Sequence, residues 1–192
     1  MQTTARAEVV TEPAAEPVSL AEARAHVTLA ATDTNHDTEL SRSIEDARQQ
    51  WEHDTATFYI TRTMRLKLGG FEAFQFPHKP VSEITSITYY DLSNQSQTLD
   101  AAVYQLDTPN NRLRLAYDQD WPSTVSRWDA VTVNYTLGEH DDSTTVPAIA
   151  KRAMLLLVGY YFENRDMHAN EVAYSRKAYE ALVAKYMRST YP

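Results

Sequence analysis

Acidic side chains at alternate positions are the first candidates for chemistry. Asp33-x-Asn35-x-Asp37 resembles the opening of a calcium-binding loop, in which such oxygens hold the ion. That loop needs glycine at its sixth position and a bidentate glutamate at its twelfth, where this chain has Thr38 and Ile44. A calcium site is therefore disfavoured, and we expect Asp37 to cap a helix instead.

The sequence contains no recognisable metal-binding or nucleophile motif. The six histidines are scattered, and none is in an HExxH pair or another metal-ligand spacing. His140 lies beside Asp141 and Asp142, a group that could bind a metal weakly but is more typical of a solvated turn. The chain has no cysteine, which excludes disulfides and thiolate chemistry. Its four glycines form no phosphate-binding or nucleophile-elbow motif. The sequence does not exclude a pair of carboxylates for acid–base catalysis, because such a pair needs no local motif. We expect no cofactor, no metal and no enzyme.

Arginine and aromatic side chains between residues 112 and 128 could stack the bases of single-stranded nucleic acid. Acidic residues interrupt this group, and the whole chain has a formal net charge of −8, which disfavours phosphate binding. Residues 1–60 carry most of the negative charge, whereas residues 147–192 are net basic. The arginines and aromatic residues concerned are Arg112, Arg114, Arg127, Tyr117, Trp121 and Trp128.

Four helices are expected from the spacing of apolar residues. Ser19-x-x-Glu22 is a capping box, which predicts the start of a short helix. A second, amphipathic helix is predicted from Asp37 to Ala56, and a last one over about Ala169–Arg188. The helix over Val146–Asp166 is apolar on almost all sides but too short to span a membrane, so we expect it at the centre of a core.

From Thr61 the apolar period changes from helical to two, which predicts strands. The order helix, helix, strands, helix, helix indicates an α+β fold, a helical base with an antiparallel β insertion. We expect residues 18–60 and 147–192 to form the helical core, residues 61–146 the insertion, and residues 1–17 a flexible arm. The expected strands include Met64–Leu68, Ile84–Tyr90, Val103–Leu106, Arg112–Leu115 and Val131–Thr136.

Six short segments then stand out by their order and spacing. They are Pro17–Ala23, Phe76–Val81, Ile84–Tyr90, Val131–Gly138, Val146–Ile149 and the run from Leu155 to Arg165. Together they resemble the head–tail connector, or neck adaptor, family of tailed bacteriophages. The resemblance covers about Pro17–Asp166 and rests on the set, since each segment alone is weak.

The resemblance implies a structural virion protein without catalysis. Such proteins form a ring, commonly of twelve subunits, that binds the portal protein at the capsid vertex. The ring extends the DNA channel and presents a surface to a head-closure or tail protein. We therefore expect a neck location in the virion, assembly in the host cytoplasm, DNA passing without specific binding, and no membrane association.

Two sets of residues are expected to make these contacts. Subunits should meet through the helical part, at Trp51, Leu157, Tyr160, Tyr161 and Phe162. The basic, amphipathic C-terminal segment should dock on the portal, although a fourth helix packed on its own core explains the same pattern. Its candidate residues are Arg176, Lys177, Tyr179, Leu182, Lys185, Tyr186, Arg188 and Tyr191.

Two other classes of function remain open from the sequence. One is a small enzyme or ligand-binding protein with a pocket in its β domain. The other is a nucleic-acid-binding module that uses the arginine and aromatic residues named above.

Overall fold

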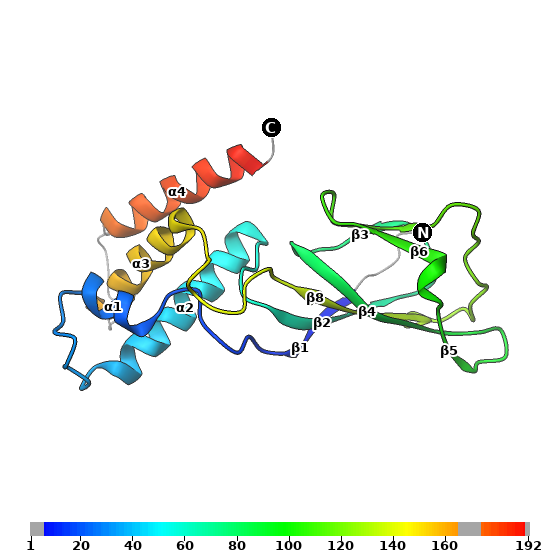
Figure 1. Ribbon diagram of the computed structural model, residues 1–192, viewed down its shortest axis with the longest axis horizontal. Helices are drawn as coiled ribbons and strands as arrows, with labels where there is room; N and C mark the ends of the chain where they lie inside the picture. The colour runs from blue at the N-terminus through cyan, green and yellow to red at the C-terminus, as the bar shows by residue number, and fades with distance from the viewer. Residues whose placement is uncertain (1–5, 165–173, 191–192) are drawn as a thin grey trace. The chain divides into compact units, whose positions relative to one another are not determined.

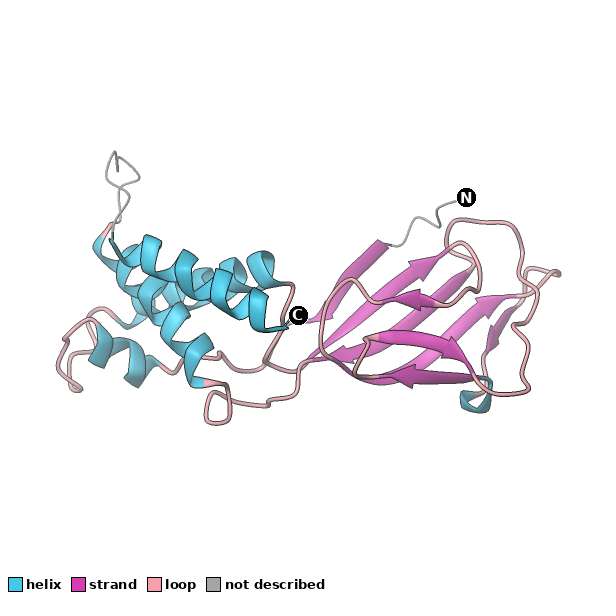
Figure 2. Ribbon diagram, turned by 90° about the horizontal axis from the view of Figure 1, so that it is seen from above, coloured by secondary structure: helices cyan, strands magenta, loops and turns pink. Residues whose placement is uncertain are grey.

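The computed structural model describes residues 6–164 and 174–190, which form two compact units (Figures 1 and 2). The helical unit draws on residues 15–57 and 140–192, and the β unit on residues 1–14 and 58–139. Helices from both ends of the chain therefore belong to one unit, and the other contains the strands between them together with a strand at residues 6–11, so it extends beyond the expected insertion of residues 61–146 at its N-terminal side and ends at residue 139. This confirms the predicted α+β fold class.

The first helix, α1 (Leu20–His26), begins with the predicted capping box. The Ser19 hydroxyl oxygen accepts a hydrogen bond from the Glu22 backbone N–H at 3.3 Å. In return, the Ser19 backbone N–H donates to Glu22 Oε2 at 2.8 Å. The two bonds satisfy donors that a helix start would leave unpaired, so local sequence alone determines this boundary.

The second helix, α2 (Asp37–Thr55), also lies where its apolar period predicts it, but it is not capped as expected. His36 occupies the cap position and makes no capping bond with its side chain. Asp37 is the first helical residue, and its Oδ1 accepts a hydrogen bond from Arg24 Nε of α1 at 2.9 Å. Capping by Asp37 was therefore wrong, because an arginine from the preceding helix takes up the carboxylate.

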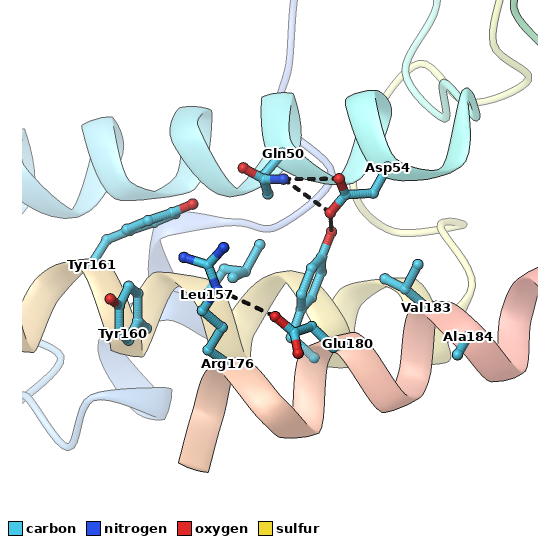
Figure 3. A pocket seen from close by; sticks show the side chains of 10 residues that line it. Gln50, Asp54, Leu157, Tyr160, Tyr161, Arg176, Glu180, Val183 and Ala184 are labelled. Carbon is cyan, nitrogen blue, oxygen red and sulfur yellow. Dashed lines mark hydrogen bonds and ion pairs between the residues drawn. The ribbon is translucent and has the colours of Figure 1, made fainter. Parts of the chain in front are cut away.

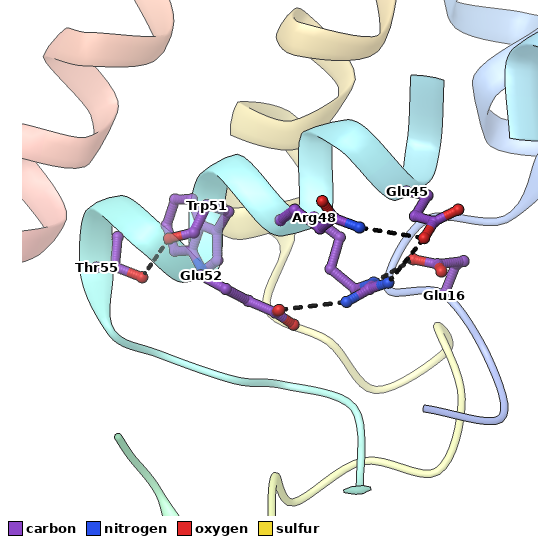
Figure 4. Close-up of polar contacts among 7 residues, drawn as sticks. Glu16, Glu45, Arg48, Trp51, Glu52 and Thr55 are labelled. Atoms are coloured by element: carbon purple, nitrogen blue, oxygen red, sulfur yellow. Dashed lines mark hydrogen bonds and ion pairs between the residues drawn. The ribbon is translucent and has the colours of Figure 1, made fainter. Parts of the chain in front are cut away.

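A buried arginine ties α2 to the segment before α1 (Figure 4). Arg48 is only 5% exposed, and its Nε lies 2.8 Å from Glu16 Oε2. Its Nη1 lies 3.2 Å from Glu52 Oε2, one turn further along α2. Because a buried charge is stable only when paired, these carboxylates allow Arg48 to sit inside the unit. The pairing with Glu16 also attaches the segment before α1 to α2.

The third helix, α3 (Ala148–Glu163), is the centre of the helical unit. It packs against α1, α2 and α4 (Tyr174–Thr190), as its all-round apolar surface predicts. None of the helices in the described ranges is both long and apolar enough to cross a bilayer. The predicted start of the last helix at Ala169 lies outside the described residues. The buried residues of α3 are Ala150, Ala153, Met154, Leu157 and Val158.

The β unit contains a five-stranded and a three-stranded antiparallel sheet. The larger has the order β1-β2-β8-β4-β5 and the smaller β3-β7-β6, so β2 and β8 are neighbours although the chain between them is long. The larger sheet consists of β1 (Arg6–Thr11), β2 (Arg62–Leu68), β8 (Val131–Leu137), β4 (Val81–Tyr90) and β5 (Ser96–Thr98). The smaller consists of β3 (Phe74–Gln75), β7 (Arg112–Leu115) and β6 (Tyr104–Asp107), with a short 3₁₀ helix η1 (Ala101–Val103) before β6.

Apolar residues alternate with polar ones along β2 and β8, and their buried sides form the centre of the core of this unit. Leu66 pairs with Val133 and Met64 with Tyr135, and all four side chains are at most 3% exposed. The residues between them are partly exposed, as period-two strands with one buried face require. The five predicted strands form as β2, β4, β6, β7 and β8, whereas the short strands β3 and β5 were not predicted.

One polar side chain fixes a loop of the β unit. Asn111, in the turn before β7, is 7% exposed and has a φ of 53°. Its amide nitrogen donates to the carbonyl oxygens of Phe76 (3.2 Å) and His78 (2.7 Å). Its amide oxygen accepts a hydrogen bond from the Val81 N–H at 3.1 Å. The segment leading into β4 is therefore held by a residue thirty or more positions away.

The chain before α1 differs from the expected flexible arm. Residues 6–11 form β1, an edge strand in which Ala7 pairs with Leu66 and Val9 with Met64. Ala7 packs against the core, whereas Val9 and Val10 remain 43% and 44% exposed. A six-residue strand with a single apolar pair, Val9–Val10, is hard to predict from its sequence. It forms because its backbone pairs with that of β2.

Candidate interaction site

A hollow of about 360 Å³ opens in the helical unit between α2, α3 and α4 (Figure 3). Its walls combine aromatic rings with charged and amide groups, which is the composition of a recognition site rather than of an empty apolar cavity. The lining residues are Gln50 and Asp54 from α2, Leu157, Tyr160 and Tyr161 from α3, and Arg176, Tyr179, Glu180, Val183 and Ala184 from α4.

Asp54 is the polar centre of the hollow. The Tyr179 hydroxyl donates to Asp54 Oδ2 at 2.8 Å, and Gln50 Nε2 donates to Oδ1 at 2.9 Å. Partial burial by itself would raise the pKa of Asp54, but the hydrogen bonds from Gln50, Tyr179 and His53 outweigh it and lower the pKa below its usual value. Asp54 therefore stays a carboxylate at neutral pH.

A second hollow of about 380 Å³ adjoins the first and shares Gln50 and Tyr161 with it. Asp46, Gln49 and His53 complete its lining. Burial, and then the charge of Asp46, raise the pKa of Tyr161.

Negative charge predominates across the two hollows. Arg176 is already engaged, since its Nε lies 3.4 Å from Glu180 Oε1. Within the described ranges Asp46 has no ion-pair partner, so Asp46 and Asp54 give the joined hollows a surplus of two negative charges. The site can therefore accept a cationic group beside the rings of Tyr160 and Tyr161, whose centroids are 5.6 Å apart.

Three of the five predicted subunit-interface residues meet at this site. Leu157, Tyr160 and Tyr161 line the hollow, with Leu157 at its floor only 3% exposed. Trp51 does not join them. Its side chain is 1% exposed, and its ring lies 5.1 Å from that of Tyr186 inside the unit. Phe162 points elsewhere, with its ring 5.6 Å from that of His36.

The predicted docking residues divide between the inside and the outside of the unit. Tyr179 is 3% exposed, and Tyr186 contacts Trp51 and places its hydroxyl 3.4 Å from Thr57 Oγ1. In this structure α4 is thus packed on its own unit, the alternative that the sequence left open. The remaining candidates are Arg176 at the hollow, Leu182 half-buried, Lys177 and Lys185 exposed, and Arg188 and Tyr191, whose side chains lie outside the described part.

The metal-like spacings of the sequence have local explanations. Asp33 Oδ1 accepts the Asn35 backbone N–H at 3.0 Å, and Asp37 is paired with Arg24. His140 Nδ1 lies 2.8 Å from Thr145 Oγ1 in the loop before α3. Within residues 6–164 and 174–190 we find no group of three or more metal-binding side chains.

The arginine and aromatic residues of the β unit do not assemble into a stacking platform. Arg127 Nη2 donates to Asp129 at 2.9 Å, and its guanidinium lies 4.3 Å from the centre of the Tyr90 ring. Arg114 is paired with Asp107. Trp121 stacks on Phe71 with ring centroids 5.1 Å apart and planes 2° from parallel. Of the aromatic side chains in question, Tyr117 and Trp128 stay exposed.

Solved structures share this fold over nearly the whole chain. A chain from the neck of an empty gene transfer agent (GTA) particle, computed with C6 symmetry, matches with a TM-score of 0.76 and 23% identity, covering 94% of both chains. A chain from the virion of the native GTA particle matches with a TM-score of 0.76 and 22% identity, again over 94% of each. One from the native GTA neck, computed with C12 symmetry, gives 0.70 and 22% over the same coverage.

At this identity the comparison establishes the fold. The chain has the architecture of proteins found in the necks of GTA particles, so the predicted resemblance to neck proteins is confirmed for the fold. No family model and no curated protein sequence matches the chain.

Proposed function

We propose that this chain is a structural neck protein that assembles into a ring at the portal vertex of a phage-like particle. The observation that carries the proposal is the match over 94% of both chains to neck chains solved with six- and twelve-fold symmetry. Both units of the fold are included in that match, which argues for a shared role of the whole chain. We propose that this ring has twelve subunits.

The acidic hollow between α2, α3 and α4 is the subunit contact that we propose for this ring. A ring needs two different patches per subunit that fit one another. Tyr160 and Tyr161 supply aromatic area for one of them, of the kind that is enriched at protein interfaces, and Leu157 adds an apolar lining.

The outer side of α4 is our candidate for the portal contact. Lys177 and Lys185 are exposed there and have no ion-pair partner among the described residues. They can meet acidic portal groups while Tyr179 and Tyr186 hold α4 on its own unit. The ring would then extend the DNA channel and present its far side to a head-closure or tail protein. With a net charge of −8, its lining lets DNA slide without specific binding.

The proposal can be tested on the purified protein, both alone and mixed with capsids. Negative-stain images and native mass spectra of the full chain, alone and mixed with portal-bearing capsids, should show rings or ring-decorated portals. A compact monomer that ignores portals, and that a small molecule stabilises, would overturn the proposal in favour of a ligand-binding protein. Tight binding to DNA at physiological salt would contradict the sliding channel.

A further inference from the structure

The hollow and one strip of α3 carry opposite charge. Among the described arginines of the helical unit, Arg24, Arg48 and Arg176 are each in an ion pair. Arg152 on α3 is exposed and has no such partner in the described part of the chain. Its neighbour Lys151 is engaged, with Nζ 2.7 Å from Glu22 Oε1. Arg152 is thus the cation of the central helix that its own unit leaves unused.

Apolar side chains accompany Arg152 on the same strip of the helix. Ile149 precedes it by three residues and is 37% exposed, and Leu156 follows by four and is half-buried. Residues three and four apart lie on one helical face. Tyr160 follows Leu156 by four residues and ends this strip at the edge of the hollow, whereas Leu157 and Tyr161 lie on another face of α3, where they line the hollow. A single helix therefore presents a guanidinium with apolar flanks on one side and borders an acidic, aromatic hollow on another.

We infer that, in the ring, Arg152 of one copy enters the acidic hollow of the next copy. The guanidinium would stack on the Tyr160 or Tyr161 ring and pair with Asp46, whose carboxylate has no ion-pair partner among the described residues. Ile149 and Leu156 would cover the rim. The two patches differ, so the contact is head-to-tail, the kind that closes into a ring. The inference rests on the proposed function and names its subunit contact.

Arginine at this position fits better than the lysines of α4. A planar guanidinium both stacks on a tyrosine ring and binds a carboxylate through two N–H groups, whereas an ammonium group is a strongly hydrated point charge. Lys177 is followed by Ala181 at four positions, and Lys185 is preceded by Leu182 at three, so the preference for Arg152 over Lys185 rests on the chemistry of the guanidinium.

Cross-linking between single-cysteine variants tests the contact, because the chain has no cysteine of its own. Asp46→Cys and Arg152→Cys chains, carrying tags of different mass, are assembled together into rings and treated with a short bismaleimide. We expect mixed dimers joining position 46 to position 152, at least about tenfold more abundant than same-variant dimers. Rings in which the cross-link joins 46 to 46, or 46 to Lys177→Cys in its place, would overturn the inference.

Charge reversal provides an independent measurement. Arg152→Asp and Asp46→Arg should each lower the yield of rings about tenfold, and together in one chain they should restore it, since a tenfold change is the size expected for one well-formed charge pair. Arg112→Asp, which reverses an exposed arginine of the β unit, is the control and should leave the yield unchanged. Circular dichroism confirms that each variant folds. Rings unaffected by Arg152→Asp would overturn the inference and leave the proposed function standing, whereas absence of rings from the unaltered protein in every sample would overturn both.

Discussion

The Tyr179 hydroxyl donates a hydrogen bond to Asp54 Oδ2 at 2.8 Å, across 125 positions of sequence. The bond joins α4 to α2 and lies in the wall of the acidic hollow (Figure 3). Burial, and then the bond to Asp54, raise the pKa of Tyr179, so the phenol remains a donor throughout the physiological range. One contact therefore both attaches the last helix and shapes the candidate interaction site.

Removal of that hydroxyl should loosen α4 without creating a cavity. We expect Tyr179→Phe to lower the free energy of unfolding by about 1–2 kcal/mol, the usual worth of a partly buried hydrogen bond to a charged group. Urea denaturation followed by circular dichroism measures the change. Tyr117→Phe, at a tyrosine that is 98% exposed, is the control and should change nothing measurable. Equal stability of Tyr179→Phe and the unaltered protein would contradict the role assigned to the bond.

The Glu22 carboxylate should make the stability of the helical unit depend on acid pH. Partial burial by itself would raise its pKa, but hydrogen bonds from Lys151 and Ser19 outweigh it, so the pKa lies below the ordinary 4.5. A lowered folded-state pKa gives stability that is complete above the unfolded value and is lost as pH falls through the folded one. We expect the free energy of unfolding to decrease below about pH 4.5.

A matched variant isolates this contribution. Glu22→Gln keeps a side chain that can complete the capping box but cannot titrate. Its stability should be lower than that of the unaltered protein at pH 7, and the difference should shrink as the pH approaches 3. A difference that grows with acid would show that Glu22 is not stabilised as a carboxylate.

Gly138, at the end of β8, should not tolerate a side chain. Its φ is +89°, and an added Cβ would lie 2.7 Å from the backbone carbonyl of Ile60. We expect Gly138→Ala to destabilise the β unit by about 3 kcal/mol, through strain and displacement of a backbone that cannot yield. Thermal unfolding measures the effect. Gly70→Ala, where the nearest atom to an added Cβ is Thr124 Oγ1 at 3.7 Å, should change stability by less than about 1 kcal/mol.

The portal contact proposed for α4 can be separated from its folding role. We expect Lys177→Glu combined with Lys185→Glu to fold normally, because both side chains are exposed, yet to bind portal-bearing capsids at least about tenfold more weakly. Co-sedimentation with capsids measures the binding. Normal recruitment of this variant would show that the portal contact lies elsewhere. A deletion of residues 176–192 is less informative, since it also removes the buried Tyr179.

Local patterns predicted most of the secondary structure. The capping box at Ser19 and Glu22, the apolar face of α2 and the period-two runs of β2 and β8 each form where their spacing indicates. These signals are local because a helix cap satisfies neighbouring backbone groups and a half-buried strand needs alternating polarity. β1 had too few apolar residues for such a pattern, and its partner strand lies far along the chain.

Sequence alone therefore determined the helices, the longer strands β2, β4 and β8 with β6 and β7, and the apolar surface of the central helix, but not the strands β1, β3 and β5. Tertiary structure decided which polar groups meet: Asp54 with Tyr179, Arg48 with Glu16, and Asn111 with the backbone of residues 76–81. It also decided that Trp51 is core, while Leu157 and Tyr161 border a hollow. The physical reason is that apolar spacing identifies the buried side of each element, whereas a hydrogen bond or ion pair depends on the distance between two atoms. That distance is set only when the elements pack.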